Sequence, residues 1–231
     1  MKIYWIRAQA PRRVLAMARH LGLDFEPVEL DPAAGEMTRD DYLSLNPNGK
    51  APTLVDGDTV LFEASAIMAY FARKAGSDVW PADNWDEQID VLKWLSWADS
   101  HWNPAVGPRY FEYVVKPTFL NASVDPEALT GTDDALRKYA GILDARMQGR
   151  DWIALDRLSI ADFQAASMAA YWKVARMPLA DFPNVLAWLE RLEALPAWRS
   201  PWPHGLDMAT EGGAPEGGSP EVAGDPVTAG E

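Results

Sequence analysis

Residues 46–67 read NPNGKAPTLVDGDTVLFEASAI, and this stretch says most about how the first part of the chain folds. It opens on a turn cluster, which is followed by two apolar runs, Pro52 to Val55 and Thr59 to Phe62. The runs are separated by Asp-Gly-Asp, and a short Gly-containing turn between two such runs predicts a β-hairpin. From Ala64 to Ala75 the apolar residues recur at helical spacing. The stretch therefore predicts strand, strand and helix.

The residues before this stretch predict a strand, a helix and another strand. Lys2 to Ile6 suits a buried strand, and a helix beginning near Pro11 ends at Gly22. Phe25 to Leu30 is a second strand, and short connections of this kind indicate a parallel βαβ unit. A short helix is predicted over Thr38 to Leu45. We therefore expect residues 1–79 to form an α/β domain of order βαβ-ββα.

Beyond a connector at residues 80–85 (WPADNW), the pattern is helical almost throughout, so residues 86–204 predict an all-helical domain. Prolines 104 and 108 are expected to interrupt or kink its first long helix. Ser159 and Asp162 have the spacing of a capping box. The expected helices are Asp86–Trp102, Arg109–Val115, Ser159–Val174 and Pro183–Leu195, together with Asp125–Met147 as one helix or a pair of helical segments.

Composition excludes several classes of protein. The chain has 231 residues, a net charge of −13 and no cysteine, which is enough length for two domains and leaves no disulfide and no protein-borne thiol nucleophile. With only three histidines, a metal site is not expected. The negative charge argues against nucleic-acid binding, which depends on cationic contacts to phosphates.

The charge is concentrated at the end of the chain. Residues 205–231 contain six acidic residues and no Lys or Arg, so they carry −6 of the −13. Rich in Gly and without aromatic residues, this segment is expected to be a disordered acidic tail. Because no early apolar run is long enough for a signal peptide or a membrane span, we expect a cytoplasmic location and no membrane partner.

Four motifs, in order over about residues 1–200, resemble the cytosolic glutathione transferase family. Asn46–Leu54 resembles the family's turn into a cis-proline, and Leu61–Ile67 its strand-to-helix junction at the γ-glutamyl end of glutathione. Leu158–Phe163 resembles the capping signature of a helix in the second domain. Phe111–Pro117 resembles a stretch of some bacterial members, which suggests the bacterial type. The resemblance implies a thioredoxin-like first domain, glutathione as co-substrate and a homodimer.

The resemblance also implies a glutathione site. The backbone of Ala51 beside Pro52 would pair with the peptide as an added strand. The helix that starts after Glu63 would attract a carboxylate, while Glu63 itself would attract the ammonium group. In the alternative interpretation, Glu63 and Ser65 only cap a helix. The full set of expected glutathione-binding residues is Lys50, Ala51, Pro52, Glu63, Ala64 and Ser65.

The expected catalytic position lacks its usual side chain. Family members supply Ser, Tyr or Cys near the end of the first strand, whereas residues 5–13 (WIRAQAPRR) contain no hydroxyl and no thiol. A free thiol with a pKa of ~8.5 is only about 3% ionised at pH 7, and lowering that pKa to ~6.5 requires about 2.7 kcal/mol. Gln9 could donate a hydrogen bond to the thiolate, and Arg7 could lower the pKa by its charge.

An opposite wall for an apolar or aromatic electrophile could come from the helical domain. The candidates are Trp97, His101, Trp102 and Tyr110, although an aromatic stripe at helical spacing is more often core. The main hypothesis is attack of glutathione thiolate on such an electrophile. The alternatives are a non-catalytic binding protein of the same fold, or a glutathione-dependent isomerase, ether-cleaving or dehalogenating enzyme.

Overall fold

The computed structural model describes residues 1–203 of the chain, so the expected acidic tail at 205–231 lies outside the described residues. The first domain contains one mixed sheet in the order β2-β1-β3-β4. β1 pairs in parallel with β2, and β3 is antiparallel to both β1 and β4. The strands are β1 (Lys2–Trp5), β2 (Glu26–Glu29), β3 (Thr53–Asp56) and β4 (Thr59–Phe62). The predicted βαβ-ββα order is confirmed.

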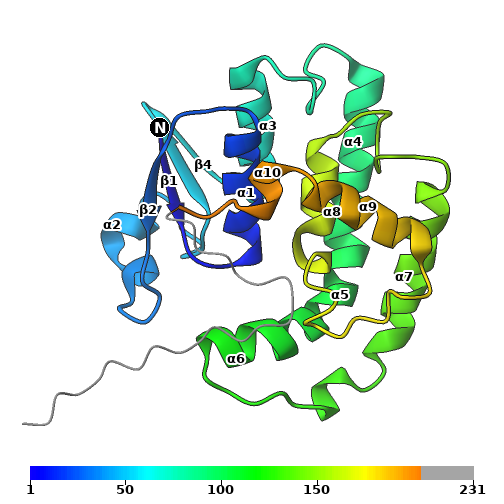
Figure 1. Ribbon diagram of the computed structural model, residues 1–231. Helices are drawn as coiled ribbons and strands as arrows, with labels where there is room; N and C mark the ends of the chain where they lie inside the picture. Colours follow the sequence, from blue (N-terminus) through cyan, green and yellow to red (C-terminus); the bar gives the residue numbers. More distant parts are fainter. Residues whose placement is uncertain (204–231) are drawn as a thin grey trace, which may run out of the picture.

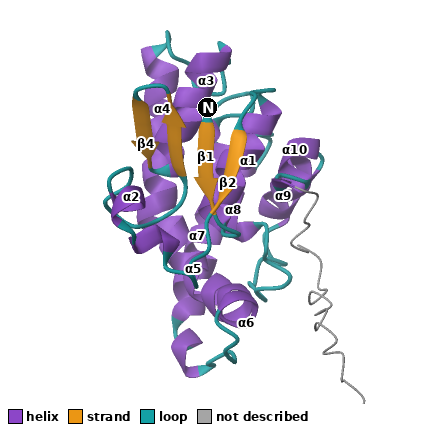
Figure 2. Ribbon diagram, turned by 90° about the vertical axis from the view of Figure 1, so that its left-hand side faces the viewer, coloured by secondary structure: helices purple, strands orange, loops and turns teal. Residues whose placement is uncertain are grey.

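The register of the sheet brings three separate segments to one edge. Tyr4 lies opposite Thr53, and Thr53 lies opposite Phe62. The end of β1, the start of β3 and the end of β4 are therefore neighbours, as Figure 2 shows for the strands. This edge places the loop after β1, the turn before β3 and the junction after β4 next to one another.

Two helices fill the space between the sheet and the second domain. α1 (Gln9–His20) and α3 (Ala64–Ala75) lie on the inner side of the sheet, and the short α2 (Asp40–Leu43) lies on the outer side (Figure 1). All residues of α1 from Pro11 to Ala18 are buried, because the sheet covers one side of the helix and the helical domain covers the other. Two arginines, Arg12 and Arg13, are buried between the domains for this reason.

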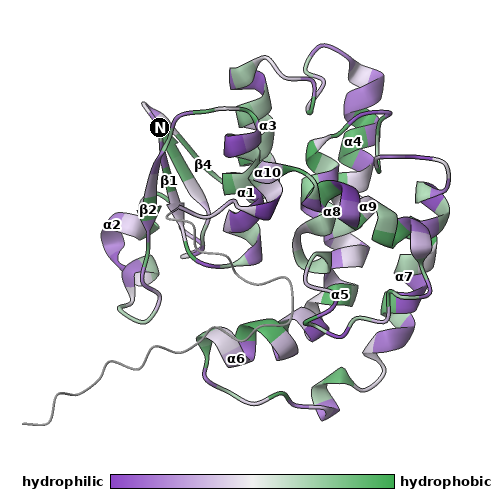
Figure 3. Cartoon of the chain, viewed as in Figure 1, coloured by the Kyte–Doolittle hydropathy of each residue, from purple (hydrophilic) through white to green (hydrophobic). Residues whose placement is uncertain are grey.

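The second domain is all-helical, as predicted. α8, which is buried along its whole length, packs against α1, α3, α4 and α5 and is hydrophobic along most of its length in Figure 3. The helices are α4 (Trp85–Trp97), α5 (Asn103–Tyr110), α6 (Lys116–Phe119), α7 (Thr132–Met147), α8 (Ile160–Ala169), α9 (Pro183–Glu193) and α10 (Pro196–Arg199). Within residues 1–203, no helix is long and apolar enough to cross a membrane.

The helical domain differs from the predicted helix bounds in three places. Over the predicted segment Asp125–Met147, a short 3-10 turn at Glu127–Leu129 precedes α7, which begins at Thr132. Of the two predicted effects of the prolines, interruption does not occur: the helical run continues through π-helical turns at Ala98–Trp102 and Phe111–Val115. Each turn ends two residues before a proline, Pro104 or Pro117, where a wider turn relieves the crowding that a proline ring causes. α8 ends at Ala169 rather than Val174, because Tyr171 and Trp172 bond back to carbonyls only three residues earlier.

Long-range contacts join the two domains. Arg12 donates to the carbonyl of Trp198 at 2.9 Å, and its guanidinium lies 4.2 Å from the centre of that indole ring. Arg19, at the other end of α1, donates to the carbonyls of Pro201 and Trp202.

The capping box at the start of α8 is confirmed, with the Ser159 N–H donating to Asp162 at 2.9 Å.

Candidate active site

The turn before β3 presents unpaired backbone at the shared sheet edge. The Ala51–Pro52 peptide is cis, as the family resemblance implies. The carbonyl of Lys50 accepts hydrogen bonds from the Tyr42 hydroxyl and the Asn46 amide, both at 2.7 Å, which fixes the turn from inside. Within residues 1–203, the N–H and C=O of Ala51 make no hydrogen bond. An extended peptide could therefore pair with Ala51 as an added strand.

The first turn of α3 lies at the same edge and has free N–H groups. Glu63, the residue before the helix, has a φ of 70°, an uncommon conformation for a residue with a side chain. Among residues 1–203, no side chain caps this helix start, and its first turn contains no acidic residue. Ala64 is buried and Ser65 half-buried. The helix start can therefore accept a carboxylate, and the exposed Glu63 can pair with an ammonium group.

Gln9 is the first residue of α1, and its amide orientation is fixed by its neighbours. The side-chain oxygen accepts from Arg13 Nη1 at 2.7 Å and from Ser167 Oγ at 2.5 Å. A guanidinium can only donate hydrogen bonds, so the atom facing Arg13 must be the oxygen of Gln9. The –NH2 group therefore points the other way, and no acceptor within residues 1–203 pairs with it.

Arg13 places a buried positive charge behind Gln9. Burial lowers the pKa of Arg13 to about 10, an effect opposed by the nearby carboxylates of Asp99 and Glu63. Asp99 is in turn held by the Gln164 amide at 2.5 Å. Because the pKa of Arg13 stays well above neutral, its guanidinium is charged at physiological pH. Within residues 1–203, no side chain caps the start of α1, so the positive end of the helix dipole also lies beside Gln9.

Arg7, the other predicted catalytic residue, does not join this cluster. Its Nε lies 3.6 Å from Oε1 of Glu29 at the end of β2, and both side chains are more than 40% exposed. A solvated ion pair of this kind has little effect on a neighbouring group. The geometry therefore favours Gln9 over Arg7 as the residue that faces a thiolate.

The structure places the residues of the predicted aromatic wall in different surroundings. Trp102 is fully buried and donates to the carbonyl of Ala165, so it belongs to the core. Trp97 and His101 pack on Tyr139 of α7. The helix α7 lies on the side of the helical domain away from α1 (Figure 1). Helical spacing correctly placed Trp97 and His101 on one face, but that face meets α7 instead of the sheet edge.

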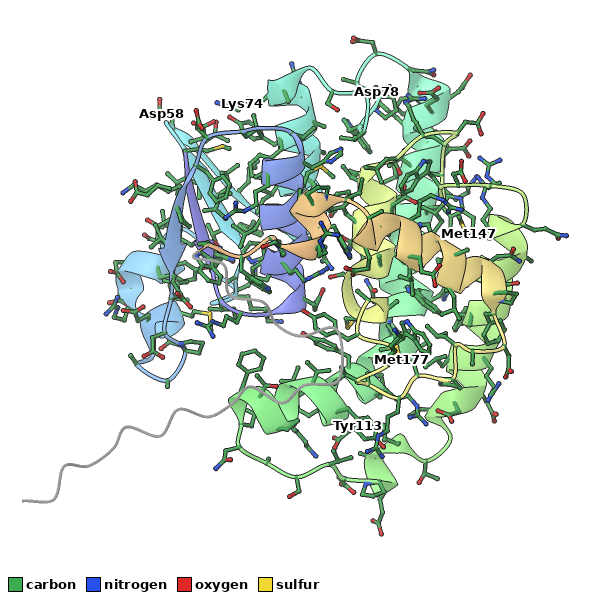
Figure 4. All side chains as sticks on the ribbon, in the orientation of Figure 1. Asp58, Lys74, Asp78, Tyr113, Met147 and Met177 are labelled. Carbon is green, nitrogen blue, oxygen red and sulfur yellow. The ribbon has the colours of Figure 1, made fainter. Side chains whose placement is uncertain are left out.

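Tyr110 is the member of the predicted wall that does approach Gln9. Its buried hydroxyl faces the Gln9 backbone and has no good hydrogen-bond partner within residues 1–203. Burial raises the pKa of Tyr110, and the neighbouring Tyr171 raises it further, so the hydroxyl stays protonated. On the same helical run, Phe111 is exposed, and Tyr113 lies under the guanidinium of Arg176 near the lower end of the molecule in Figure 4.

A groove of about 620 Å³ lies elsewhere, at the far end of α3. Its charged lining includes Arg73, Asp78, Glu87 and Arg157, and Arg157 already pairs with Asp78 at 2.6 Å and with Glu87. Asp78 is at the upper edge of the molecule in Figure 4, and a twelve-residue helix separates the groove from Glu63 by about 18 Å. The groove is therefore separate from the sheet edge.

In residues 1–203, no three His, Asp or Glu side chains are close enough to hold a metal.

Comparisons with known proteins agree with this geometry. Residues 1–73 match the model of the glutathione S-transferase N-terminal domain, and residues 111–196 match that of the C-terminal domain. Glutathione S-transferase 3 of Zea mays is 34% identical over 194 residues, covering 81% of this chain and 86% of the relative. The chain belongs to the glutathione S-transferase family. Its activity is accordingly the conjugation of glutathione to electrophiles.

Solved structures of glutathione S-transferases have the same fold. One, bound to lactoylglutathione, has a TM-score of 0.78 and 27% identity, covering 87% of this chain and 97% of its own. Another, glutathione S-transferase I from mais with an atrazine glutathione conjugate, has a TM-score of 0.75 and 28% identity, covering 85% and 93%. The bacterial type expected from the sequence is not specifically indicated, since the relatives with a named source here are plant enzymes.

Sequence reasoning missed three residues of this candidate site. Arg13 could have been found, because it is four residues after Gln9 and so lies on the same face of a helix. Asp99 had no distinguishing pattern among 34 acidic residues. Ser167 lies 158 residues from Gln9 and reaches it only because α8 packs on α1.

Proposed function

We propose that this glutathione S-transferase activates glutathione with the amide of Gln9 in place of a hydroxyl or thiol. The observation that carries the proposal is the anchored amide oxygen, which leaves the –NH2 group of Gln9 free to donate at the start of α1. A thiolate accepts such a bond better than a thiol, so the bond lowers the thiol pKa. The thiol proton passes to solvent, and the sulfur then attacks the electrophile as the leaving group departs.

The rest of glutathione is assigned to the sheet edge. Its central backbone pairs with Ala51 next to Pro52, where the N–H and C=O are unpaired. Its γ-glutamyl carboxylate lies at the first turn of α3, near Ala64 and Ser65, and its ammonium group faces Glu63. Lys50, which is exposed at the same turn, is placed to attract the glycine carboxylate.

The energies are sufficient for this role. Moving the thiol pKa from ~8.5 to ~6.5 requires about 2.7 kcal/mol. A hydrogen bond to a charged group contributes about 1.5–3 kcal/mol, and a helix N-terminus contributes about 0.3–1 kcal/mol more. The Gln9 amide and the start of α1 together therefore reach the required amount.

An apolar or aromatic electrophile fits the helical segment beyond Tyr110. This segment exposes the large apolar side chains of Phe111, Phe119 and Leu120, and α6 lies below the sheet edge in Figure 1. The solved relative that holds an atrazine glutathione conjugate supports an aromatic substrate. Of the four residues predicted for the substrate wall, this proposal keeps only Tyr110, which lies beside Gln9.

A homodimer is proposed from an exposed apolar stripe. Trp85, Ile89 and Leu92, one or two turns apart on α4, are 70%, 42% and 49% exposed. Val60 and Phe62 on β4 are exposed as well, and β4 and α4 lie toward the same side of the molecule in Figure 2. Apolar surface of this extent is typical of an interface between subunits.

The cytoplasmic location inferred from the sequence stays a prediction.

The proposal is tested by comparing wild type with Gln9→Ala. Calorimetry measures glutathione binding, and chlorodinitrobenzene serves as a generic aromatic electrophile for turnover. We expect Gln9→Ala to bind glutathione with an affinity within about threefold of wild type but to turn over at least tenfold more slowly, because it lacks one charge-assisted hydrogen bond. Gln148→Ala, at an exposed glutamine, is the matched control. Unchanged turnover in Gln9→Ala would refute the assignment, and wild type that binds glutathione without conjugating any electrophile would favour the binding-only alternative.

A further inference from the structure

A side chain of the helical domain contacts Gln9, the residue that is proposed to activate glutathione. Ser167, on α8, is 1% exposed, and its Oγ lies 2.5 Å from Oε1 and 2.9 Å from the backbone oxygen of Gln9. Both acceptors belong to the first residue of α1. A single hydroxyl therefore holds the backbone and the side chain of Gln9 together across the domain interface.

We propose that Ser167 is a positioning residue for catalysis, which holds the Gln9 amide so that its –NH2 group donates to the thiolate of glutathione. This inference rests on the proposed role of Gln9. It assigns part of the control of thiol activation to the helical domain, although the glutathione-binding residues themselves come from the thioredoxin-like domain.

The geometry explains why two donors are needed. A glutamine side chain has three rotatable bonds, so fixing it in one orientation opposes its conformational entropy. Arg13 restrains the amide oxygen from α1 itself, one turn away, and Ser167 restrains it from α8. Because the oxygen accepts from both sides, the side chain cannot rotate to exchange its oxygen and nitrogen without leaving a buried donor unpaired.

Charged and titratable groups face this cluster from each element around it. Arg13 comes from α1, Asp99 from the π-helical turn after α4, Glu63 from the junction after β4, and Tyr110 from α5. Arg13 is balanced by the two carboxylates. Ser167 is uncharged, so its removal changes none of these charges. A change in thiol pKa on removing Ser167 would therefore report the position of Gln9.

The experiment is a double-mutant cycle with Ser167→Ala, Gln9→Ala and the combined variant. The readouts are the pKa of enzyme-bound glutathione, from the ultraviolet absorbance of its thiolate, and kcat and KM with chlorodinitrobenzene. We expect Ser167→Ala to raise the pKa of the bound thiol. At a pH below that pKa, kcat should fall about two- to tenfold, which is the range for the loss of one hydrogen bond. The KM for glutathione should stay unchanged. In the Gln9→Ala background, removing Ser167 should have no further effect.

Two further variants separate positioning from a general effect on the domain interface. Arg19→Ala removes an interdomain contact at the other end of α1 and should leave the thiol pKa unchanged. Ser167→Thr keeps the hydroxyl and should retain the wild-type thiol pKa. An equal loss of kcat on removing Ser167 with and without Gln9, or a thiol pKa unchanged in Ser167→Ala, would overturn the inference. If Gln9→Ala also left the thiol pKa unchanged, the proposed function itself would fail.

Discussion

Nη1 of Arg13 lies 2.7 Å from Oε1 of Gln9, one turn further along α1. The contact joins a buried cation to an amide whose other end is free to donate. An amide that accepts from a cation is polarised, which makes its N–H groups better donors. The positive charge of Arg13 thus reaches the thiolate through Gln9, although the guanidinium itself is buried.

Replacing Arg13 should therefore slow conjugation. Arg13→Met keeps the volume of the side chain and removes its charge and its bond to Gln9. We expect kcat at neutral pH to fall about tenfold, the value of a charge-assisted hydrogen bond, while calorimetry still detects glutathione. Arg13→Lys keeps the charge and should lose less. An Arg13→Met enzyme with wild-type kcat would show that the charge has no part in activation.

The capping box at the start of α8 should dominate local stability. Asp162 is fully buried and accepts from the N–H of Ile153, from the N–H and hydroxyl of Ser159, and from the indole of Trp188. Asp162→Ala leaves these donors unpaired, and we expect a loss of about 3–5 kcal/mol in the free energy of unfolding. Urea unfolding measures it, and Asp162→Asn, which retains one acceptor, should lose less. Equal losses in the two variants would contradict this assignment.

The carboxylate of Glu112 should make stability depend on acid pH. Hydrogen bonds from Lys116 and from the N–H of Asp125 lower the pKa of Glu112. Because its pKa is lower in the folded state than in the unfolded state, the ionised Glu112 stabilises the folded protein above about pH 4.3. This stabilisation is lost as the pH falls through the folded-state pKa. Between about pH 6 and about pH 3, Glu112→Gln should therefore lose less stability than wild type. Glu127→Gln, at an exposed position, should behave as wild type, and parallel curves for all three proteins would disprove the prediction.

The apolar stripe on α4 should hold two subunits together. Ile89→Lys combined with Leu92→Lys places two charges on this surface, and sedimentation should change from a dimer to a monomer. Ile142→Lys is the matched control, because Ile142 is an equally exposed apolar residue on α7. A wild-type monomer would refute the dimer, and dissociation by Ile142→Lys alone would place the interface elsewhere.

Local patterns in the sequence predicted most of the fold. The hairpin at Asp56–Thr59 follows from its turn residues, and the start of α8 follows from Ser159 and Asp162, because each depends on residues close together in the chain. Trp97 and His101 share a face, as their spacing predicted, and both pack on Tyr139. Helical spacing shows which side chains share a face, but only the packing of α7 shows what covers it.

The candidate site was predictable only in part. The turn at Ala51–Pro52 and the start of α3 after Glu63 were found from contiguous motifs. Gln9 was a candidate because of its place before a helix, but its orientation depends on Ser167, which is distant in sequence. Contacts across the domain interface arise from packing, so no local pattern reports them.

The pKa of enzyme-bound glutathione in wild type and in Gln9→Ala tests the central claim most directly. Ultraviolet difference titration measures it, and calorimetry confirms that both proteins are saturated with glutathione. We predict a wild-type value at least one unit below the ~8.5 of the free thiol and a value in Gln9→Ala that is about one unit higher than in wild type. The same pKa in both saturated proteins would contradict the claim that Gln9 activates glutathione.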